Sequence, residues 1–200
     1  MTIGELQTTE RLSNKGAYLQ VDSSMLKRIL SQSLGTALAM DTETTGLKVE
    51  GPQAPARALW VGLVPIGSHV CLICRADTFQ KNWDILKDRQ FICHKGRFDF
   101  HALDLIPSKP WYDTKARKYY DSMTANSSLD ACAAEYGISK IETPDALKKD
   151  GGITEVPEHE LFEYLADDVL STAMIAGHQG PMDGSLVSLE SSPVKVRTQS

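Results

Sequence analysis

Residues 36–47 read TALAMDTETTGL, a short apolar run followed by two acidic residues. The apolar run predicts a buried strand, and the TTG that follows favours a turn. Asp41 and Glu43 are two residues apart, so both side chains leave the same face of that strand. Two like charges this close destabilise each other unless a cation lies between them. The pattern therefore indicates either a cation site or a solvated strand end, and by itself it leaves both open.

Strands and helices alternate on both sides of this stretch. Upstream, residues 17–22 predict a strand and residues 23–34 predict a helix. Downstream, PIG at 65–67 predicts a hairpin between two apolar strands. This order predicts an α/β fold with a mixed central sheet. The elements expected downstream are strands at 58–64, 69–76, 90–94 and 118–121 and helices at 79–89, 98–106, 122–136 and 157–177.

Composition places the chain among folded globular proteins. Of its 200 residues, 42% are hydrophobic and 24% are charged, which argues against a disordered, collagen-like or coiled-coil body. No stretch approaches the roughly 20 apolar residues of a membrane span. Glu5 and Glu10 argue against a signal or transit peptide. We expect a cytoplasmic protein with no membrane partner.

Net charge and cysteine content exclude further classes of protein. The net charge of −5 argues against binding nucleic acid through bulk positive charge. It fits a chain whose carboxylates hold divalent cations, which then supply the positive charge that a phosphate meets. Four cysteines are too few for a disulfide framework, and Cys71 and Cys74 should point to opposite faces of one strand. Cys93 and Cys132 are expected in the core.

Two further acidic positions stand on predicted helices. In FICHKGRFDFHAL (91–103), Asp99 falls where a helix begins, a place that capping and the helix dipole also favour. In ELFEYLADDVLSTAMI (160–175), Tyr164 and Asp168 are four apart and share a helix face. Asp168 borders an apolar stripe, so its charge needs a partner, and a metal ion is one such partner.

Together these positions resemble the motifs of the DEDD superfamily of 3′–5′ exonucleases. That family has DxE on its first strand, an Asp that opens a helix after HNxxFD, and YxxxD on a late helix. YDSM at 120–123 also resembles the family's FDTM. The resemblance implies a ribonuclease H-like mixed sheet with helices on both faces. The counterparts of the four carboxylates are, in order, Asp41, Glu43, Asp99 and Asp168.

The last motif indicates the branch of the family. One branch has a histidine five residues before the last Asp, where this chain has Glu163. Tyr164 instead matches the tyrosine branch, which includes the proofreading domains of family A DNA polymerases, ribonuclease D and the Werner-type exonucleases. DTETTGL, the early hairpin and the segment before the last motif look most like the family A polymerase type.

The resemblance also implies a cofactor and residue roles. Two divalent ions, Mg²⁺ or Mn²⁺, are expected, because these cations prefer oxygen ligands. Asp41, Glu43 and Asp168 are expected to hold the ion that generates the hydroxide, and Asp41 with Asp99 the ion at the leaving group. Tyr164 is expected to orient the attacking water.

Substrate contacts and boundaries follow from the same resemblance. HKGRFD departs from HNxxFD, because a lysine stands at the usual asparagine. The exonuclease domain is expected at 17–178, with an N-terminal extension at 1–16 and a disordered tail at 179–200. The expected substrate-binding residues are Thr44, Leu47, Lys95 and Phe98.

Three functional hypotheses remain open on the sequence. The first is a proofreading-type exonuclease that acts on single-stranded DNA 3′ ends and releases nucleoside 5′-monophosphates. A separately encoded DNA polymerase is its expected partner, and a bacterial or phage-infected host cytoplasm its expected location. The second is ribonuclease D-like processing of RNA 3′ ends. The third is a catalytically silent module that binds nucleic acid.

Overall fold

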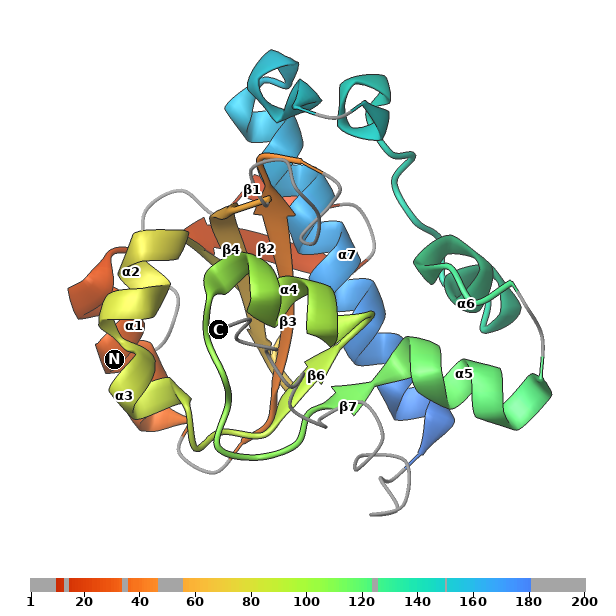
Figure 1. Cartoon of the computed structure of the whole chain (residues 1–200), viewed down its shortest axis with the longest axis horizontal. Helices are drawn as coiled ribbons and strands as arrows, with labels where there is room; N and C mark the ends of the chain where they lie inside the picture. Colours follow the sequence, from red (N-terminus) through yellow and green to blue (C-terminus); the bar gives the residue numbers. More distant parts are fainter. Residues whose placement is uncertain are drawn as a thin grey trace, which may run out of the picture.

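The structure is a computed structural model that describes residues 10–12, 15–33, 36–46, 56–123, 126–149 and 151–180. Its strands form one sheet in the order β1-β2-β5-β4-β3-β6-β7 (Figure 1). The strands are β1 (Glu10–Leu12), β2 (Gly16–Gln20), β3 (Leu38–Thr44), β4 (Ala58–Pro65), β5 (Val70–Arg75), β6 (Phe91–Cys93) and β7 (Tyr112–Asp113). The helices are α1 (Ser23–Gln32), α2 (Ala76–Lys81), α3 (Trp83–Leu86), α4 (Gly96–Leu103), α5 (Thr114–Ser122), α6 (Leu129–Glu135), η2 (Asp145–Lys148), η3 (Gly152–Glu155) and α7 (Glu158–Gln179).

Strand β3, which carries the DTET sequence, lies inside the sheet. It pairs antiparallel with β4 and parallel with β6. Strands β4 and β5 form the antiparallel hairpin that PIG predicts, and β7 pairs parallel with β6. At the other edge, β2 pairs parallel with β5 and β1 pairs antiparallel with β2. The combination of parallel and antiparallel pairs confirms the predicted mixed sheet.

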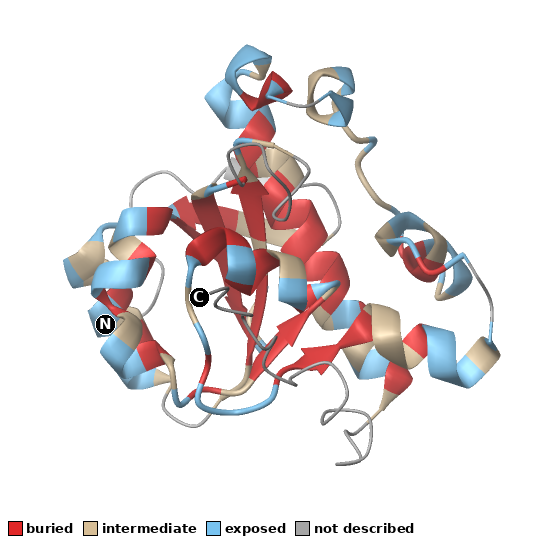
Figure 2. Ribbon diagram, in the orientation of Figure 1, coloured by how far each residue is buried: buried red, intermediate tan, exposed pale blue. Residues whose placement is uncertain are grey.

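The two faces of the sheet bury separate hydrophobic cores. Leu38 and Met40 point into the core that helices α1 to α4 cover, whereas Ala39 points into the core beneath α7. Leu165 and Val169 recur at helical spacing on α7 and pack in that second core. Figure 2 shows buried residues along the strands and along α7, with exposed residues on the outer faces of the smaller helices. Helices on both faces confirm the predicted α/β class.

The strand predicted at 118–121 is wrong. Those residues lie in α5, and the last strand of the sheet is β7, earlier in the chain. Tyr119 and Tyr120 favour a strand by residue type. However, Asp113 accepts hydrogen bonds from two backbone N–H groups of the next turn and thereby caps a helix. The capping bonds start the helix before the two tyrosines are reached.

Other element boundaries also differ from the prediction. The helix expected at 79–89 divides into α2 and α3 at Asn82, whose Nδ2 donates to Thr78 O at 2.7 Å and to Ser23 Oγ at 2.9 Å. Of the helix expected at 122–136, the described residues form the last residue of α5 and the whole of α6. Part of the expected N-terminal extension forms edge strand β1. Most of the expected tail, residues 181–200, lies outside the described residues.

The cysteines lie where the sequence predicts. All four are buried and free. Cys71 packs in the core beneath α7 and Cys74 packs in the opposite core, because side chains three apart on a strand face opposite sides. In the part of the chain that the structure describes, no helix combines the length and the apolar character needed to cross a membrane.

Candidate active site

Strand β3 carries Asp41 and Glu43 to the face that α7 covers. They follow Ala39 at a spacing of two, and Ala39 packs beneath α7. Directly across from Asp41, strand β4 has Gly62. A Cβ atom at Gly62 would lie 2.8 Å from Cγ2 of Val169, so the absence of a side chain lets α7 approach the sheet closely. The close approach brings Asp168, the neighbour of Val169, within electrostatic range of Asp41.

Asp99 reaches the same region from the first turn of α4. Thr42 points to the opposite face from Asp41, and its Oγ1 donates a 2.7 Å hydrogen bond to Oδ1 of Asp99. The carboxylate of Asp113 accepts the backbone N–H of Lys95 at 3.1 Å and that of Gly96 at 2.8 Å. These bonds hold the start of α4 against β7. Asp99 is only 2% exposed, so its hydrogen bond with Thr42 lies in the interior.

Helix α7 contributes Tyr164 and Asp168, and a loop packs over both. The hydroxyl of Tyr164 lies 3.2 Å from Oγ1 of Thr143. The ammonium of Lys140 donates to Oδ1 of Asp168 and lies 5.4 Å from the centroid of the Tyr164 ring. Each of the five residues that the sequence predicts as catalytic thus lies within electrostatic range of another of the set, and the loop adds two residues beside α7.

The four carboxylates act on one another through their charges. Burial, followed by the charge of Asp168, raises the pKa of Asp41 to about 7. Burial, followed by the charges of Asp41 and Asp168, raises the pKa of Glu43 well above its ordinary value. Burial and the nearby Asp41 likewise raise the pKa of Asp99. Burial also raises the pKa of Asp168, and contact with Lys140 limits that rise. Such a cluster of like charges attracts a cation.

The donor set suits a hard divalent cation. All four acidic groups are carboxylates, and Mg²⁺ and Mn²⁺ prefer oxygen ligands. As they are placed, no three acidic, histidine or cysteine side chains of the described residues lie close enough together to hold an ion. The cation that contacts Asp168 is the ammonium of Lys140. The residues therefore fit a divalent cation by charge and by donor type, with a lysine ammonium at one of the carboxylates.

Two of the predicted substrate-binding residues lie together at the start of α4. Nζ of Lys95 is 5.0 Å from the centroid of the Phe98 ring. Lys95 precedes the buried Asp99 by about one helical turn. Lys95 has a φ of 74°, a left-handed conformation that asparagine adopts more readily than lysine. The asparagine of the family motif HNxxFD therefore suits this backbone. The lysine instead places an exposed cation at the edge of the site.

The structure gives little information on substrate binding by the other two predicted residues, Thr44 and Leu47. The hydroxyl of Thr44 donates to the carbonyl oxygen of Gly46 at 2.6 Å, so this hydrogen bond stabilises the turn that follows β3. Leu47 lies outside the described residues, and its role remains a prediction.

Sequence reasoning missed three residues of the site. Thr42 stands between the two acidic residues of β3. Because side chains alternate between the two faces of a strand, the sequence could have predicted that Thr42 points towards α4, which carries Asp99. Lys140 and Thr143 lie in a loop without hydrophobic periodicity, far in sequence from β3. No local pattern indicates their partners, because those partners come from tertiary packing of the loop against α7.

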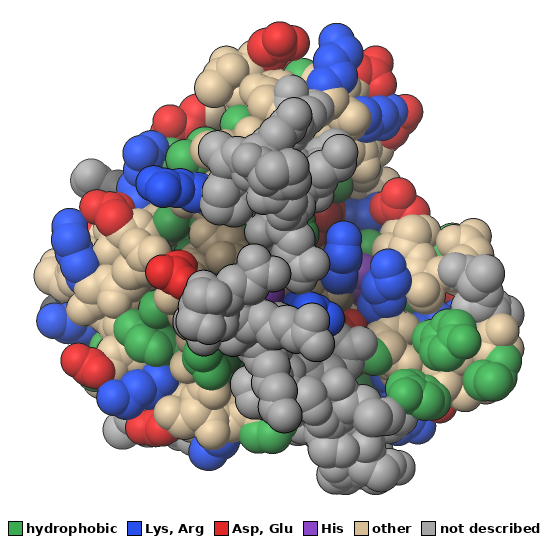
Figure 3. Space-filling model, in the orientation of Figure 1, with side chains coloured by type: hydrophobic (Ala, Val, Ile, Leu, Met, Phe, Trp, Pro, Cys, Tyr) green, Lys and Arg blue, Asp and Glu red, His purple; other side chains and the backbone are tan. Residues whose placement is uncertain are grey.

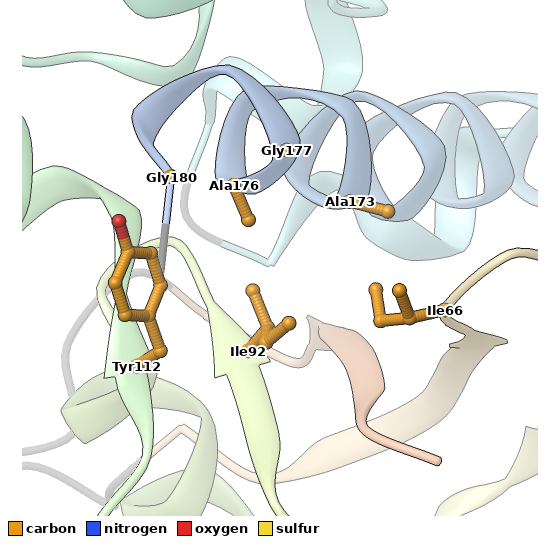
Figure 4. Close-up of a pocket in the computed structure, with 7 residues that line it drawn as sticks. All are labelled: Ile66, Ile92, Tyr112, Ala173, Ala176, Gly177 and Gly180. Atoms are coloured by element: carbon orange, nitrogen blue, oxygen red, sulfur yellow. The ribbon is translucent and has the colours of Figure 1, made fainter. Parts of the chain in front are cut away.

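A separate pocket lies at the C-terminal end of α7. Its volume is about 210 Å³, and Figure 4 shows Ala173 and Ala176 pointing from the helix towards Ile66 and Ile92. None of its lining residues belongs to the carboxylate cluster. The complete lining is Ile66, Ile92, Tyr112, Ala173, Ala176, Gly177 and Gly180.

The raised pKa of Asp41 predicts a pH-dependent stability in the presence of chelator. A pKa of about 7, above the ordinary 3.8, means that the folded protein binds more protons than the unfolded chain between these values. The resulting stabilisation is complete below about pH 4 and is lost as the pH rises through 7. We expect urea unfolding to show that this carboxyl contributes a loss of about 2.5 kcal/mol from pH 5 to 8.

The matched variant for this prediction is Asp41→Asn, which has nearly the same shape but does not titrate. We expect its stability to fall less over the same pH range, although Glu43, Asp99 and Asp168, whose pKa values are also raised, still titrate in both proteins. Burial lowers the pKa of His94 to about 4, so His94 acts in the opposite direction, but it does so equally in both proteins. Equal slopes for wild type and variant would contradict the assignment to Asp41.

Comparison with known proteins supports the fold. No protein-family model matches the chain, and no curated protein matches its sequence. Ribonuclease D of Trypanosoma brucei is similar in structure, with 20% identity and a TM-score of 0.67 over 86% of this chain and 69% of that chain. Ribonuclease D of Escherichia coli, an exoribonuclease involved in structured RNA processing, has 17% identity and a TM-score of 0.61. This match covers 81% of this chain and 44% of that one.

Part of a polymerase chain is also similar to this fold. The POL domain of Pol1 from M. smegmatis, in complex with DNA primer-template and dNTP, is 11% identical with a TM-score of 0.55. The match covers 81% of this chain and 26% of that one. At these identities the likeness shows the fold alone, and it confirms the predicted ribonuclease H-like sheet with helices on both faces.

Proposed function

We propose that this protein is a metal-dependent 3′–5′ exonuclease of the DEDD superfamily, in its tyrosine branch. The observation that carries the proposal is the placement of four carboxylates, those of Asp41, Glu43, Asp99 and Asp168, near one another in the interior, with Tyr164 one turn from Asp168 on α7. The fold shared with ribonuclease D supports it. The proposed domain spans residues 17–178, and the products are nucleoside 5′-monophosphates.

The carboxylates provide the ligands for the cofactor in this proposal. Asp41, Glu43 and Asp168 would hold one divalent ion, and Asp41 with Asp99 would hold a second. When bound, the two ions supply the Lewis acidity that activates water and stabilises the leaving 3′ oxygen. Thr42 donates to one oxygen of Asp99 and Asp99 also hydrogen-bonds Asp41, so these two contacts orient the carboxyl group of Asp99 beside Asp41.

Tyr164 provides a neutral hydrogen-bonding group beside these carboxylates. Burial, followed by the charge of Asp168, raises its pKa above the ordinary value, so the phenol stays protonated near neutral pH. Its hydroxyl can donate one hydrogen bond and accept another, and Thr143 takes one of these at 3.2 Å. The hydroxyl also hydrogen-bonds Asp168, and its remaining lone pair could accept a hydrogen bond from the attacking water and so orient it.

RNA 3′ ends are the better supported substrate. The similar ribonuclease D structures share 17 to 20% of their residues with this chain, against 11% for the polymerase domain. This comparison favours the second hypothesis from the sequence over DNA proofreading. The separate polymerase partner and the bacterial or phage setting belong to the DNA hypothesis and remain predictions.

The face in Figure 3 shows no broad basic patch among its described residues. Figure 3 shows acidic and basic side chains interspersed over the face in view. With a net charge of −5, the chain is expected to bind a phosphate backbone locally, through metal ions and a few cations such as Lys95.

Digestion of 5′-labelled RNA and of its DNA twin tests the function. We expect a ladder that shortens from the 3′ end in Mg²⁺ or Mn²⁺, disappears in chelator, and forms faster on RNA. The rate ratio for the two strands assigns the substrate, since they differ in the 2′-hydroxyl and, for T, a methyl group. Faster digestion of the DNA would restore the proofreading hypothesis. Binding of either strand without products, in any metal, would indicate the silent module.

A further inference from the structure

Lys140 places a buried ammonium within the carboxylate cluster. Its side chain is 7% exposed, and its nearest partner is Oδ1 of Asp168. Asp167 and Asp130 lie farther away, with carboxylate oxygens 3.7 and 3.8 Å from Nζ. Three carboxylates thus surround this ammonium in the interior, and opposite charges this close favour the charged form. The lysine is therefore a cation in the folded protein.

The position of this ammonium is fixed by the loop that carries it. The backbone N–H of Ile141 donates to Oδ2 of Asp167 at 3.0 Å, and Thr143 contacts the hydroxyl of Tyr164. Together with the bond from Lys140 to Asp168, three contacts attach the loop to α7. Lys140 therefore reaches its partner from a constrained backbone.

Asp167 has a separate counter-ion, so Lys140 is the main counter-ion of Asp168. Nζ of Lys15 lies 2.5 Å from Oδ1 of Asp167 and 3.0 Å from Oγ of Ser171. Oδ2 of Asp167 accepts the N–H of Ile141. Two neighbouring aspartates of α7 are thus each paired with a different buried lysine, and only the Lys140 pair involves a proposed metal ligand.

We propose that Lys140 is a built-in counter-ion that holds Asp168 in the metal-free protein and that a divalent ion displaces when it binds. This inference rests on the proposed function, which makes Asp168 a metal ligand. The ammonium and the metal ion compete for the same carboxylate, because an oxygen bonded to one cation is less available to the other. The lysine thereby keeps the cluster stable without metal and weakens metal binding.

The first test is the variant Lys140→Met, which keeps much of the apolar stem and removes the charge. In chelator we expect its Tm to fall by about 5 to 10 °C, because Asp168 loses its buried partner. We expect calorimetry to show Mn²⁺ binding about tenfold tighter than in wild type. Lys140→Arg, which keeps the charge, should not gain affinity.

Lys15→Met is the matched control. It breaks the other buried lysine–aspartate pair of α7, so its Tm should also fall, but its Mn²⁺ affinity should stay at the wild-type value. Unchanged or weaker Mn²⁺ binding by Lys140→Met would overturn the proposal, since the lysine would then have no competing role or would assist the metal.

A second measurement uses wild-type protein and therefore does not depend on folding of a variant. Acetylation of Lys140 by an amine-reactive reagent, followed by mass spectrometry, should be slow in chelator and several-fold faster in Mn²⁺. Equal protection in both conditions would refute displacement. Displacement without a digestion ladder would contradict the proposed function alone, whereas a ladder without displacement would contradict only the counter-ion role.

Discussion

Replacing both Asp41 and Glu43 with alanine is expected to lower the rate of 3′-end digestion by about 10³-fold or more. The two side chains leave the same face of β3, and both are proposed to ligate the ion that activates water. Gel analysis of the labelled oligonucleotide measures the loss. Chelator should have the same effect on wild type, and added Mg²⁺ should restore activity only where the carboxylates are intact.

A folded variant is needed to interpret this loss. The raised pKa values of Asp41 and Glu43 show that their charges are unfavourable in the metal-free fold, so the double variant should remain folded by circular dichroism. Glu158→Ala/Glu160→Ala removes two exposed charges from α7 and serves as the matched control, with an activity near wild type. More than about a tenth of the wild-type rate in the β3 variant would argue against its proposed role.

Replacing Gly62 with valine is expected to destabilise the protein by about 3 kcal/mol. The first added atom would lie 2.8 Å from Cγ2 of Val169, 3.1 Å from Cγ of Leu165 and 3.3 Å from Sγ of Cys71. All three neighbours belong to the close-packed core beneath α7, so they cannot all move aside without separating the helix from the sheet. Urea unfolding measures the change in free energy.

The same substitution should also lower activity. Gly62 lies directly across from Asp41, and α7 carries Tyr164 and Asp168, so a displaced helix separates the proposed ligands. A displacement of about 1 Å at such a site can reduce the rate about 10²-fold. Gly177→Ala is the control, because a Cβ there meets no atom within 4 Å and alanine favours the helix. Wild-type stability of Gly62→Val would show that α7 tolerates a greater separation than its packing indicates.

The helical and strand periodicities explain how the sequence predicts part of the site. Asp41 and Glu43 share a face because strands have a period of two, and Tyr164 and Asp168 share a face because a helix has a period of 3.6. Neither inference depends on a contact with another part of the chain. The same local reasoning fails at 118–121, where two tyrosines favour a strand but the capping bonds of Asp113 start a helix.

The sequence by itself therefore determined the α/β class, the central strand, the hairpin after it and the spacing of the carboxylates. Tertiary structure alone decided which side chains meet. It brought Lys140 and Thr143 from an irregular loop onto α7, and it placed α7 against β4 at Gly62. The physical reason is range: periodicity fixes the direction of a side chain relative to its own element, whereas a contact between elements depends on the packing of both.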